Sequence, residues 1–370
     1  MKIGIVTLHD YNFGSALQCY ASQSFLETLG YEVEIIDLYS KAGTIGSYAM
    51  TLWNLLMKCV LNPTKCKHIL RIFLSQRSST LTLSTASRMD IREFNINYLN
   101  CWKYTKKELR SVSKQDEYVA FLSGSDQVWN GSRIDDYYKY FLRFAPRGKR
   151  IAWAASFGGD SVAPYNLRCF SKYISEFAHI SVRESSGIDL VNSLTRCSAI
   201  CLSDPIMLLT AGQWREKLPT LSCKNDTYIL AFFIDKPSGK AIADLQYLQN
   251  ENGIPVYSFG YQHEEMIGAE HYDGNPFEFL KFIDNAQYIF TDSFHVVAFS
   301  TLFHKNFWAY ERMYTHNQNQ SARLLEFLAK VNLHNRFEPK KIIADMPCFD
   351  DADKYIVKAK EEMQHYLKEI

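Results

Sequence analysis

The segment TDSFH (291–295) gathers side chains that can bind and protonate an anion. An apolar run ending at Thr291 predicts a buried strand and the residues after His295 predict a helix, so Asp292 or Ser293 would cap that helix. Free amides at the start of a helix bind anions, and an imidazole beside them can donate a proton. The segment therefore predicts a phosphate-ester site at His295. A simple capped turn with a packed histidine fits the same spacing.

Arg183 and Glu184 stand directly after another short apolar run, at 180–182. An arginine at the carboxyl end of a strand can hold a carboxylate or a phosphate through two parallel hydrogen bonds. The same two residues would also make an ordinary structural ion pair. The spacing leaves both interpretations open.

A third polar segment, GSDQVWN (124–130), also follows an apolar run. Its glycine allows a ligand to approach the backbone closely. Asp126, Gln127 and Trp129 then offer a carboxylate, an amide and an aromatic face, which suit a sugar. A plain turn is an equal alternative.

The loop NFGS (12–15) precedes the first helical pattern, so Asn12 and Gly14 could cradle an anion at the start of that helix. The loop lacks the full GxGxxG pattern, which argues against a dinucleotide cofactor. The chain also lacks a P-loop, an HExxH pair, a GxSxG elbow and a clustered His/Asp metal set. Transfer chemistry without a metal is therefore expected.

These polar segments stand at the ends of apolar runs, and the runs predict a parallel sheet. A strand at 2–7, a helix at 16–29 and a strand at 32–38 form a βαβ unit, whose strands are parallel. Four later runs are also predicted strands: 118–123, 150–156, 180–182 and 199–202. Ligands collect at the carboxyl ends of such strands.

A second series of elements begins near residue 224. Its predicted strands are 228–234, 255–259, 288–291 and 306–310, and its predicted helices are 237–251, 276–285 and 295–303. The alternation predicts a second doubly wound sheet. The expected fold is therefore α/β, with two Rossmann-like domains, at 1–205 and 206–320, facing a cleft. Closing helices are expected within 321–370, at 321–331 and 351–368.

Residues 38–89 differ in composition from the rest of the chain. They contain no Asp or Glu but carry seven basic residues: Lys41, Lys58, Lys65, Lys67, Arg71, Arg77 and Arg88. We expect a helical insert of two short helices with a basic, apolar exterior. Acidic residues from elsewhere in the fold would balance this charge in the simplest interpretation. The alternative is an anionic membrane, which attracts basic side chains and accepts a tryptophan such as Trp53 at the headgroup level.

The composition indicates a cytoplasmic globular protein. The chain has 370 residues, and roughly 150 residues per domain suggests two domains. The net charge of +1 gives no general attraction to nucleic acid. The nine cysteines include no CxxC pair, so we expect reduced packing residues. The first residues do not form a signal peptide, and no apolar run is long enough to span a bilayer.

Several blocks, in order, resemble one known family. The opening KIGIVTLHDYNFGSALQCYA is similar to that family's first strand, loop and helix. The further blocks are LSGSDQVWN (122–130), AASFG (154–158), VRESSG (182–187), SDP (203–205), TDSFHVVAFSTLF (291–303) and SARLL (321–325). Together they resemble the polysaccharide pyruvyl transferase family over roughly residues 1–336.

This resemblance implies two Rossmann-like domains facing each other, as in the GT-B glycosyltransferases. It implies phosphoenolpyruvate as co-substrate, no other cofactor, and a pyruvate ketal on two hydroxyls of a sugar in a surface or capsular polysaccharide. It suggests that His295 and Arg183 line the donor site. Some members carry Arg two residues before this histidine, where this chain has Ser293. Arg323 or backbone amides would then supply the missing charge.

The implied substrates suggest roles for the candidate residues. Phosphoenolpyruvate is a multiple anion, so Arg183 would hold its carboxylate and His295 would act as general acid or bind its phosphate. Asp126 or Glu184 would act as base on a sugar hydroxyl.

The acceptor is expected on the first domain, where Gln127 and Trp129 lie. It would be a sugar or an oligosaccharide on a lipid carrier at the inner face of a membrane, as the resemblance implies. We therefore also expect reversible, peripheral contact of residues 38–89 with anionic lipid.

Two other functions remain open. A GT-B glycosyltransferase with a nucleotide sugar would need an acidic residue for the ribose in the second domain, such as Glu264, Glu265 or Glu270. A non-catalytic glycan-binding protein would bind saccharide and act on neither donor.

Overall fold

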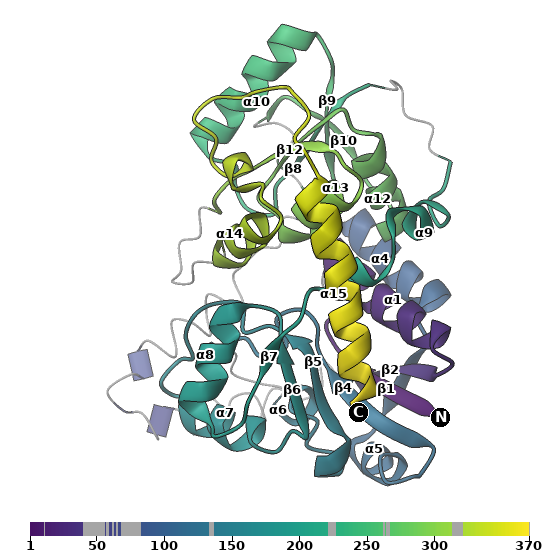
Figure 1. The fold of residues 1–370 in the computed structure, drawn as a ribbon. Coiled ribbons are helices and arrows are strands. Elements are labelled where there is room, and N and C mark those ends of the chain that lie inside the picture. The colour runs from purple at the N-terminus through teal and green to yellow at the C-terminus, as the bar shows by residue number, and fades with distance from the viewer. Residues whose placement is uncertain are drawn as a thin grey trace.

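The computed structural model describes residues 1–10, 12–39, 83–132, 137–220, 227–261, 263, 267–312 and 321–369, with a few positions between 56 and 67. Two lobes, each built around a parallel sheet, lie one above the other in Figure 1. The first lobe holds the N-terminal sheet and the second lobe holds the C-terminal sheet. The C-terminal helix α15 (Asp350–Lys368) runs along both.

The first lobe contains a seven-stranded parallel sheet in the order β3-β2-β1-β4-β5-β6-β7. Its strands are β1 (Lys2–Val6), β2 (Glu32–Leu38), β3 (Cys101–Tyr104), β4 (Tyr118–Ser123), β5 (Arg150–Ala155), β6 (His179–Val182) and β7 (Ile200–Cys201). Its helices are α1 (Phe13–Thr28), α4 (Thr85–Tyr98), α5 (Lys106–Val112), α6 (Tyr137–Tyr140), η2 (Arg147–Lys149), α7 (Leu167–Ile174), α8 (Ser185–Leu194) and η3 (Pro205–Leu208).

The second lobe contains a five-stranded parallel sheet in the order β10-β9-β8-β11-β12. Its strands are β8 (Ile229–Phe232), β9 (Val256–Phe259), β10 (Glu270–Tyr272), β11 (Tyr288–Thr291) and β12 (Asn306–Ala309). The helices from here to the C-terminus, before α15, are α9 (Ala211–Arg215), α10 (Gly239–Asn252), α12 (Pro276–Asn285), α13 (Phe294–Leu302), α14 (Ser321–Lys330) and η4 (His334–Arg336).

Both sheets have the strand order of a Rossmann fold. In the first lobe the order reverses between β1 and β4, and in the second between β8 and β11. Ligands of doubly wound proteins bind at such reversal points, beyond the carboxyl ends of the strands. The predicted α/β class with two Rossmann-like domains is confirmed.

The lobes share one apolar core. Helices α5, α7 and α8 pack on one face of the first sheet, and α10 packs on one face of the second. The remaining faces belong to a single core, which joins α1 and α15 to both sheets and to α12 and α13. Because both faces of each sheet are buried, most of the central strands are short and largely apolar.

Phe13, the first residue of α1, lies at the centre of the contact between the lobes. Its ring stacks on Phe279 of α12, with 4.7 Å between ring centroids, and meets Phe259 of β9 edge-on at 5.4 Å. Gly260 lies against the same ring with a φ of +71°, and a Cβ there would come within 2.6 Å of Phe13. A glycine is therefore required here both by the backbone and by the ring.

The C-terminal helix ties the chain back to the first lobe. The Tyr366 hydroxyl donates a hydrogen bond to the carbonyl of Ala152 in β5, at 2.9 Å. The hydroxyls of Tyr355 and Ser203 share a hydrogen bond of 2.6 Å. Helix α15 thus contacts the loop after β7 as well as the centre of the first sheet.

The observed elements differ from the predicted ones mainly at the sheet edges and at one helix start. The edge strands β3 and β10 and the helices α4, α5, α7, α8 and α9 are additional to the predicted ones. Helix α1 begins at Phe13 rather than Ala16, because Asn12 and Ser15 cap it reciprocally. Strand β7 ends at Cys201 and β8 begins at Ile229, on either side of the predicted division after residue 205.

The basic stretch at 38–89 lies largely outside the described residues. The end of that range already belongs to the regular helix α4, which begins at Thr85 with Ser84 as its cap. The two short helices expected before it, and Trp53 with them, are outside the described part of the chain.

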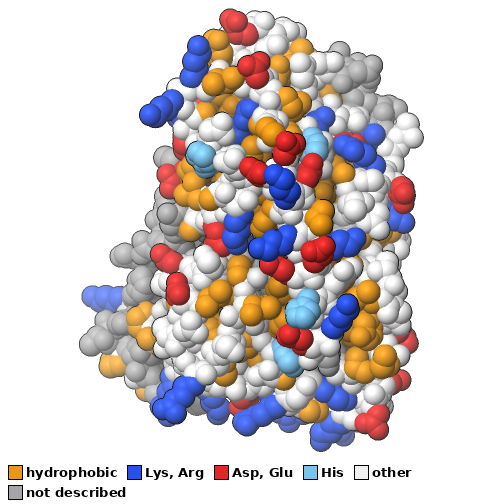
Figure 2. All heavy atoms as spheres, in the orientation of Figure 1, with side chains coloured by type: hydrophobic (Ala, Val, Ile, Leu, Met, Phe, Trp, Pro, Cys, Tyr) orange, Lys and Arg blue, Asp and Glu red, His pale blue; other side chains and the backbone are white. Residues whose placement is uncertain are grey.

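Charges of both signs alternate over the face drawn in Figure 2, with apolar side chains between them. Of the described helices, none combines the length and apolar character needed to cross a membrane.

Candidate active site

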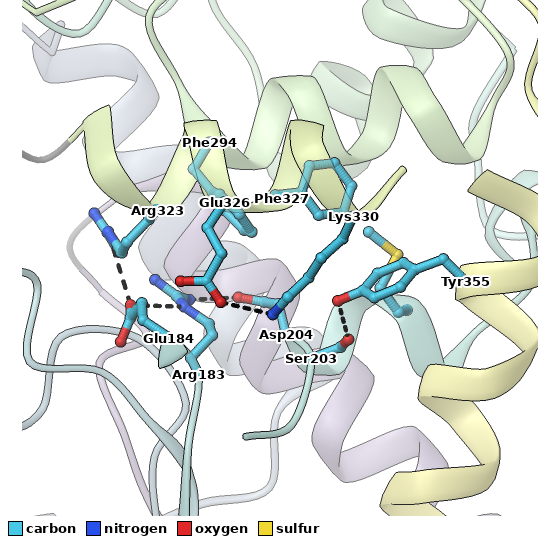
Figure 3. Close-up of a pocket in the computed structure, with 11 residues that line it drawn as sticks. Arg183, Glu184, Ser203, Asp204, Phe294, Arg323, Glu326, Phe327, Lys330 and Tyr355 are labelled. Atoms are coloured by element: carbon cyan, nitrogen blue, oxygen red, sulfur yellow. Dashed lines mark hydrogen bonds and ion pairs between the residues drawn. The ribbon is translucent and has the colours of Figure 1, made fainter. Parts of the chain in front are cut away.

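Four neighbouring strands of the first sheet end in polar residues that meet at one edge. Asp126 follows β4, Ser156 follows β5, the pair Arg183 and Glu184 follows β6, and Asp204 follows β7. Parallel strands place their carboxyl ends at the same side of the sheet, so these side chains converge. The second lobe brings α13 and α14 to the same place (Figure 3).

Arg183 is the centre of this cluster and is almost completely buried. Its Nη1 donates to Asp204, its Nε lies 3.5 Å from Glu184 Oε1, and its Nη2 lies 3.8 Å from Asp126 Oδ1. The guanidinium also lies over the ring of Phe294, 5.0 Å from the centroid. Burial lowers the pKa of Arg183, but the three carboxylates outweigh burial, so the pKa lies above its ordinary value.

The ion-pair interpretation of Arg183 is confirmed, and the anion-binding interpretation stays a prediction. Arg183 forms a buried ion-pair network in which two of its nitrogens make no hydrogen bond within the described part of the chain. Among the described residues, neither Nε nor Nη2 has a hydrogen-bond partner. A buried donor without an acceptor is costly, and an incoming carboxylate would remove that cost.

Asp204 connects Arg183 to His295 across the two lobes. His295 is the second residue of α13, and its Nε2 lies 3.5 Å from the same Asp204 oxygen that Arg183 contacts. Burial would raise the pKa of Asp204, but Arg183 and His295 lower it to about 2. A permanently ionised carboxylate thus orients the arginine of one lobe and the imidazole of the other.

Gly14 allows His295 to reach this position. A Cβ on Gly14 would lie 2.2 Å from Nδ1 and 2.4 Å from Cγ of His295. The imidazole therefore occupies the space that a side chain at position 14 would need. Gly14, the second residue of α1, was predicted to bind the donor. In the structure it lies against His295.

Glu184 has one hydrogen-bond donor and two arginines nearby. It accepts a hydrogen bond from the Ser156 hydroxyl and lies near the guanidinium groups of Arg183 and Arg323, whose Nε is 3.9 Å away. Burial and the charge of Arg183 lower the pKa of Arg323 to about 10, although Glu184 and Asp126 act in the opposite direction. Two buried arginines thus lie close enough for the charge of one to lower the pKa of the other.

A pocket of about 360 Å³, partly open to solvent, adjoins this cluster. Figure 3 shows side chains of both lobes entering it: Arg183 and Glu184 from one side, Arg323 and Lys330 from the other. Its lining consists of Arg183, Glu184, Ser203, Asp204, Met207, Phe294, Arg323, Glu326, Phe327, Lys330 and Tyr355. We call it the interlobe pocket.

Glu326 of α14 places a carboxylate at the start of α8 in this pocket. Its two oxygens accept from the Ser185 amide at 3.0 and 3.1 Å, and Lys330 lies 2.7 Å from one of them. Lys330 Nζ also lies 3.7 Å from Cys201 Sγ. The start of α8 is therefore an anion site that a protein carboxylate fills.

Asp292 and Ser293 follow β11 directly, and they differ in what they contact. Asp292 is buried and accepts from the amides of Ile234 and Asp235, so it fixes the loop after β8. Ser293 is the cap residue of α13, and its side chain makes no capping hydrogen bond. Of the two candidate caps, neither uses its side chain to cap the helix.

A family model described as polysaccharide pyruvyl transferase matches residues 12–312. The chain belongs to the polysaccharide pyruvyl transferase family. This is a family of enzymes, and the resemblance seen in the sequence blocks is confirmed. No curated protein sequence matches the chain.

Several solved structures are similar at low identity. They include an O-GlcNAc transferase mutant from Thermobaculum terrenum (10% identity, TM-score 0.42, covering 100% of this chain and 63% of that one). MurG from Acinetobacter baumannii has 10% identity, a TM-score of 0.44 and coverage of 100% and 99%. A putative UDP-N-acetylglucosamine 2-epimerase from Listeria monocytogenes has 7% identity, a TM-score of 0.48 and coverage of 99% and 88%. No activity of this chain follows from such distant similarity.

The site of this pyruvyl transferase family member contains some predicted residues and excludes others. Arg183, Glu184 and Arg323 line the interlobe pocket. Asp126 and His295 are not in the lining, but they lie 3.8 Å from Arg183 and 3.5 Å from Asp204, which are. Outside it lie the side chains of three predicted ligand contacts: Asn12, Gln127 and Trp129.

The acceptor contact predicted for Trp129 does not fit its position. The Trp129 ring is completely buried and packs against Phe141, Phe157 and Phe177. Gln127 accepts a hydrogen bond from Asn130 at 3.1 Å. The turn after β4 thus directs its tryptophan into the core, not towards a sugar.

Asn12 has a structural role in the helix cap. Its Oδ1 accepts from the Ser15 amide at 2.9 Å, so this oxygen is committed to α1. Of the acids considered for a nucleotide ribose, Glu264 and Glu265 lie outside the described residues, and Glu270 is exposed at the start of β10.

Sequence reasoning missed the role of Asp204 and the contribution of Lys330 and Tyr355. Asp204 follows a predicted strand in the SDP block, so the sequence indicates where it lies. The sequence does not indicate which residues it contacts. No motif marks Tyr355, whose position depends on how α15 crosses the lobes. Within the described residues, no group of three or more His, Cys, Asp or Glu is placed to hold a metal.

Proposed function

We propose that this enzyme transfers the pyruvyl group of phosphoenolpyruvate to two hydroxyls of a glycan sugar, forming a pyruvate ketal. The proposal rests on one observation in a member of this enzyme family. Arg183 of the first lobe and His295 of the second lobe both contact Asp204. An unsatisfied buried guanidinium suits a carboxylate, and an imidazole beside it suits acid catalysis.

The reaction balances without a redox partner. The methylene carbon of the donor accepts a proton, and a sugar hydroxyl adds to the neighbouring carbon and loses its own proton. The phosphate then leaves, and a second hydroxyl adds at the same carbon and closes the ketal. Two sugar protons are released, one for the new methyl group and one for the phosphate.

Three residues divide this work in the proposal. Arg183 holds the donor carboxylate through Nε and Nη2, and His295 supplies the proton to the methylene carbon. Glu184 takes the proton of the attacking hydroxyl, because it is the carboxylate of the predicted pair that faces the pocket. Asp204 is a positioning residue, and Asp126 anchors Arg183 from the other side.

The direct test supplies the purified enzyme with phosphoenolpyruvate and a panel of sugars and lipid-linked oligosaccharides. Release of phosphate that depends on the acceptor, with a product heavier by the mass of a pyruvate ketal, supports the proposal. The same panel with nucleotide sugars is the control for a glycosyltransferase. Transfer from a nucleotide sugar but not from phosphoenolpyruvate would contradict it.

We further propose that the enzyme works in the cytoplasm on surface or capsular glycan precursors and docks on anionic membranes. The support is the acid-free basic stretch at 38–89 with Trp53. Charge reversal at Lys58, Lys65 and Lys67 should abolish sedimentation with anionic vesicles at low salt and spare activity on a soluble acceptor. Absence of vesicle binding by the unmodified protein would refute docking.

A further inference from the structure

The interlobe pocket has two halves, and the reaction proposed above uses only one of them. The first half contains the buried ion pairs around Arg183. The second half is formed by α14, α15 and the segment after β7. Its residues are Ser203, Glu326, Phe327, Lys330 and Tyr355. Figure 3 shows Arg323 and Glu184 at one end of the pocket and Tyr355 and Ser203 at the other, so we call the second half the Tyr355 half.

A row of aromatic rings connects the two halves. Phe294, over which the guanidinium of Arg183 lies, meets Phe327 edge-on with 5.6 Å between ring centroids. Phe327 meets Tyr355 in the same way at 6.0 Å. All three rings line the pocket. The faces of a pyranose carry C–H groups, which pack on aromatic side chains as other apolar groups do, so this row suits a sugar better than a small anion.

Lys330 and Glu326 add a cation and an anion that neutralise each other. Lys330 Nζ lies 2.7 Å from Glu326 Oε1 and donates to Cys201 Sγ at 3.7 Å, which leaves one of its three donors for a ligand. Both oxygens of Glu326 accept from the Ser185 amide, and a carboxylate has about four acceptor sites, so one site remains. Burial lowers the pKa of Lys330, but Glu326 and its other neighbours raise it above its ordinary value, so the ammonium stays charged.

Ser203 and Tyr355 add two hydroxyls to the same half. They share a hydrogen bond of 2.6 Å. Whichever of them donates in this bond, one hydroxyl proton and lone pairs on both oxygens are left for a ligand. A sugar hydroxyl also donates and accepts, whereas a phosphate or a carboxylate at neutral pH mainly accepts. The Tyr355 half therefore offers the mixture of donors and acceptors that a sugar ring needs.

We propose that the Tyr355 half of the interlobe pocket binds the acceptor, and that the sugar ring held there carries no charge. The inference rests on the proposed function and names its acceptor class. Phe327 supports the face of the ring, and Lys330 and Tyr355 hydrogen-bond to its hydroxyls. An anionic sugar would have to draw Lys330 away from Glu326, and separating a partly buried ion pair is costly.

This placement brings the acceptor next to the proposed base. Glu184 lies 3.5 Å from Arg183 Nε, and it directly precedes Ser185, whose amide donates to Glu326 at 3.0 Å. A ring beside Glu326 would thus present a hydroxyl to Glu184, with the donor on Arg183 close by. The same placement gives the acceptor a position that does not depend on Trp129, which is buried in the core.

The kinetic test compares the KM of the acceptor with that of the donor. Tyr355→Phe removes one hydroxyl, and Lys330→Met removes the ammonium but keeps an unbranched side chain. Each should raise the acceptor KM about tenfold, the usual effect of a lost hydrogen bond, and leave the KM of phosphoenolpyruvate unchanged. Lys354→Met is the matched control, because Lys354 precedes Tyr355 in α15, is exposed and pairs with Asp351. Thermal unfolding of each variant checks that it is folded.

Direct binding is measured without the donor. The probes are the methyl glycosides of glucose, galactose, mannose and glucuronic acid, observed by saturation-transfer NMR with the full-length protein. We expect neutral glycosides to bind the unmodified protein and the Lys354→Met control equally, and to bind Tyr355→Phe and Lys330→Met more weakly. Tighter binding of the glucuronide than of every neutral glycoside would overturn the assignment of an uncharged ring.

The outcomes separate the acceptor subsite from the proposed function. Glycoside binding that both substitutions weaken, in a protein that transfers no pyruvyl group, would overturn the function and support the sugar subsite. Pyruvyl transfer with an unchanged acceptor KM in both variants would overturn the subsite and leave the function. A raised KM of phosphoenolpyruvate in both variants would place the donor in the Tyr355 half and also overturn the subsite. Failure of every glycoside to bind the unmodified protein would do the same.

Discussion

At the residue scale, the site depends on a shared carboxylate. Asp204 contacts Arg183 of its own lobe and His295 of the other with the same oxygen. In the proposed reaction, one fixed group between them would therefore align the donor carboxylate and the proton source. Such alignment is worth large rate factors, since a misplacement of about 1 Å can cost about 100-fold.

We expect His295→Ala to lower pyruvyl transfer by about 100-fold or more, the usual loss when an acid–base group is removed. His304→Ala is the matched control, because His304 lies two residues after the end of α13 and its side chain is 47% exposed. Initial rates with phosphoenolpyruvate and acceptor measure both variants. A His295→Ala enzyme as active as the control would exclude the imidazole from the chemistry.

The low pKa of Asp204 predicts an acid-sensitive fold. The pKa falls from 3.8 to about 2 on folding, so the stabilisation is complete above pH 4 and is lost as the pH falls through about 2. Denaturant unfolding should show that Asp204→Asn is less stable than the unmodified protein near pH 6, and that the difference shrinks towards pH 2. Asp160→Asn, at an exposed position, serves as control. A difference that stays constant with pH would contradict the ion-pair account.

At the element scale, the start of α1 determines where the histidine of α13 lies. Gly14→Ala favours the helix by about 0.5–1 kcal/mol, yet its Cβ would lie 2.2 Å from His295 Nδ1. We expect the imidazole to be displaced from Asp204 and turnover to fall by about 100-fold. Gly239→Ala in α10, with no atom within 4 Å of its Cβ, should leave turnover unchanged. Equal activity of both variants would disprove this positioning role.

Elements with strong local patterns were predictable from the sequence. The bounds of β2, β4, β11 and α12 agree with the predicted ranges, because each is a largely apolar strand, a strand of alternating residues or an amphipathic helix with clear ends. The edge strands β3 and β10 were missed. They are short and only partly buried, so no alternation or apolar run marks them.

Arg323 of α14 was predicted from the family resemblance, whereas from pattern alone the site was predictable where a residue follows a buried strand. Arg183, Glu184 and His295 could be found in this way, since strand ends collect ligands in parallel sheets. Asp204 also ends a strand, but its role appears only when the two lobes meet. The sugar contact predicted for Trp129 was wrong, because the residue types of a turn do not show which side of it a tryptophan faces.

At the scale of the whole molecule, the shared core makes the two lobes one folding unit. Phe13 of the first lobe is packed among Phe232, Phe259 and Phe279 of the second, and α15 returns to Ala152 of the first sheet. Neither lobe can therefore unfold without exposing apolar surface of the other. The interlobe pocket owes its geometry to the same contacts.

Calorimetry should accordingly show one unfolding transition. Phe13→Ala should lower the free energy of unfolding by about 3–5 kcal/mol and move that single transition to a lower temperature. Tyr247→Ala removes an aromatic ring that is 49% exposed and should shift it little. Two separate transitions in the unmodified protein would show that the lobes fold independently.

The packing of Gly14 under His295 also constrains how this sequence can evolve. A side chain at position 14 and an imidazole at position 295 would occupy the same volume, so position 14 cannot gain a side chain while the imidazole stays in place. Relatives that retain the histidine should retain the glycine, and lineages that lose one should lose the constraint on the other. Paired loss of both residues would then mark descendants that have given up the ancestral reaction while keeping the two-lobed scaffold.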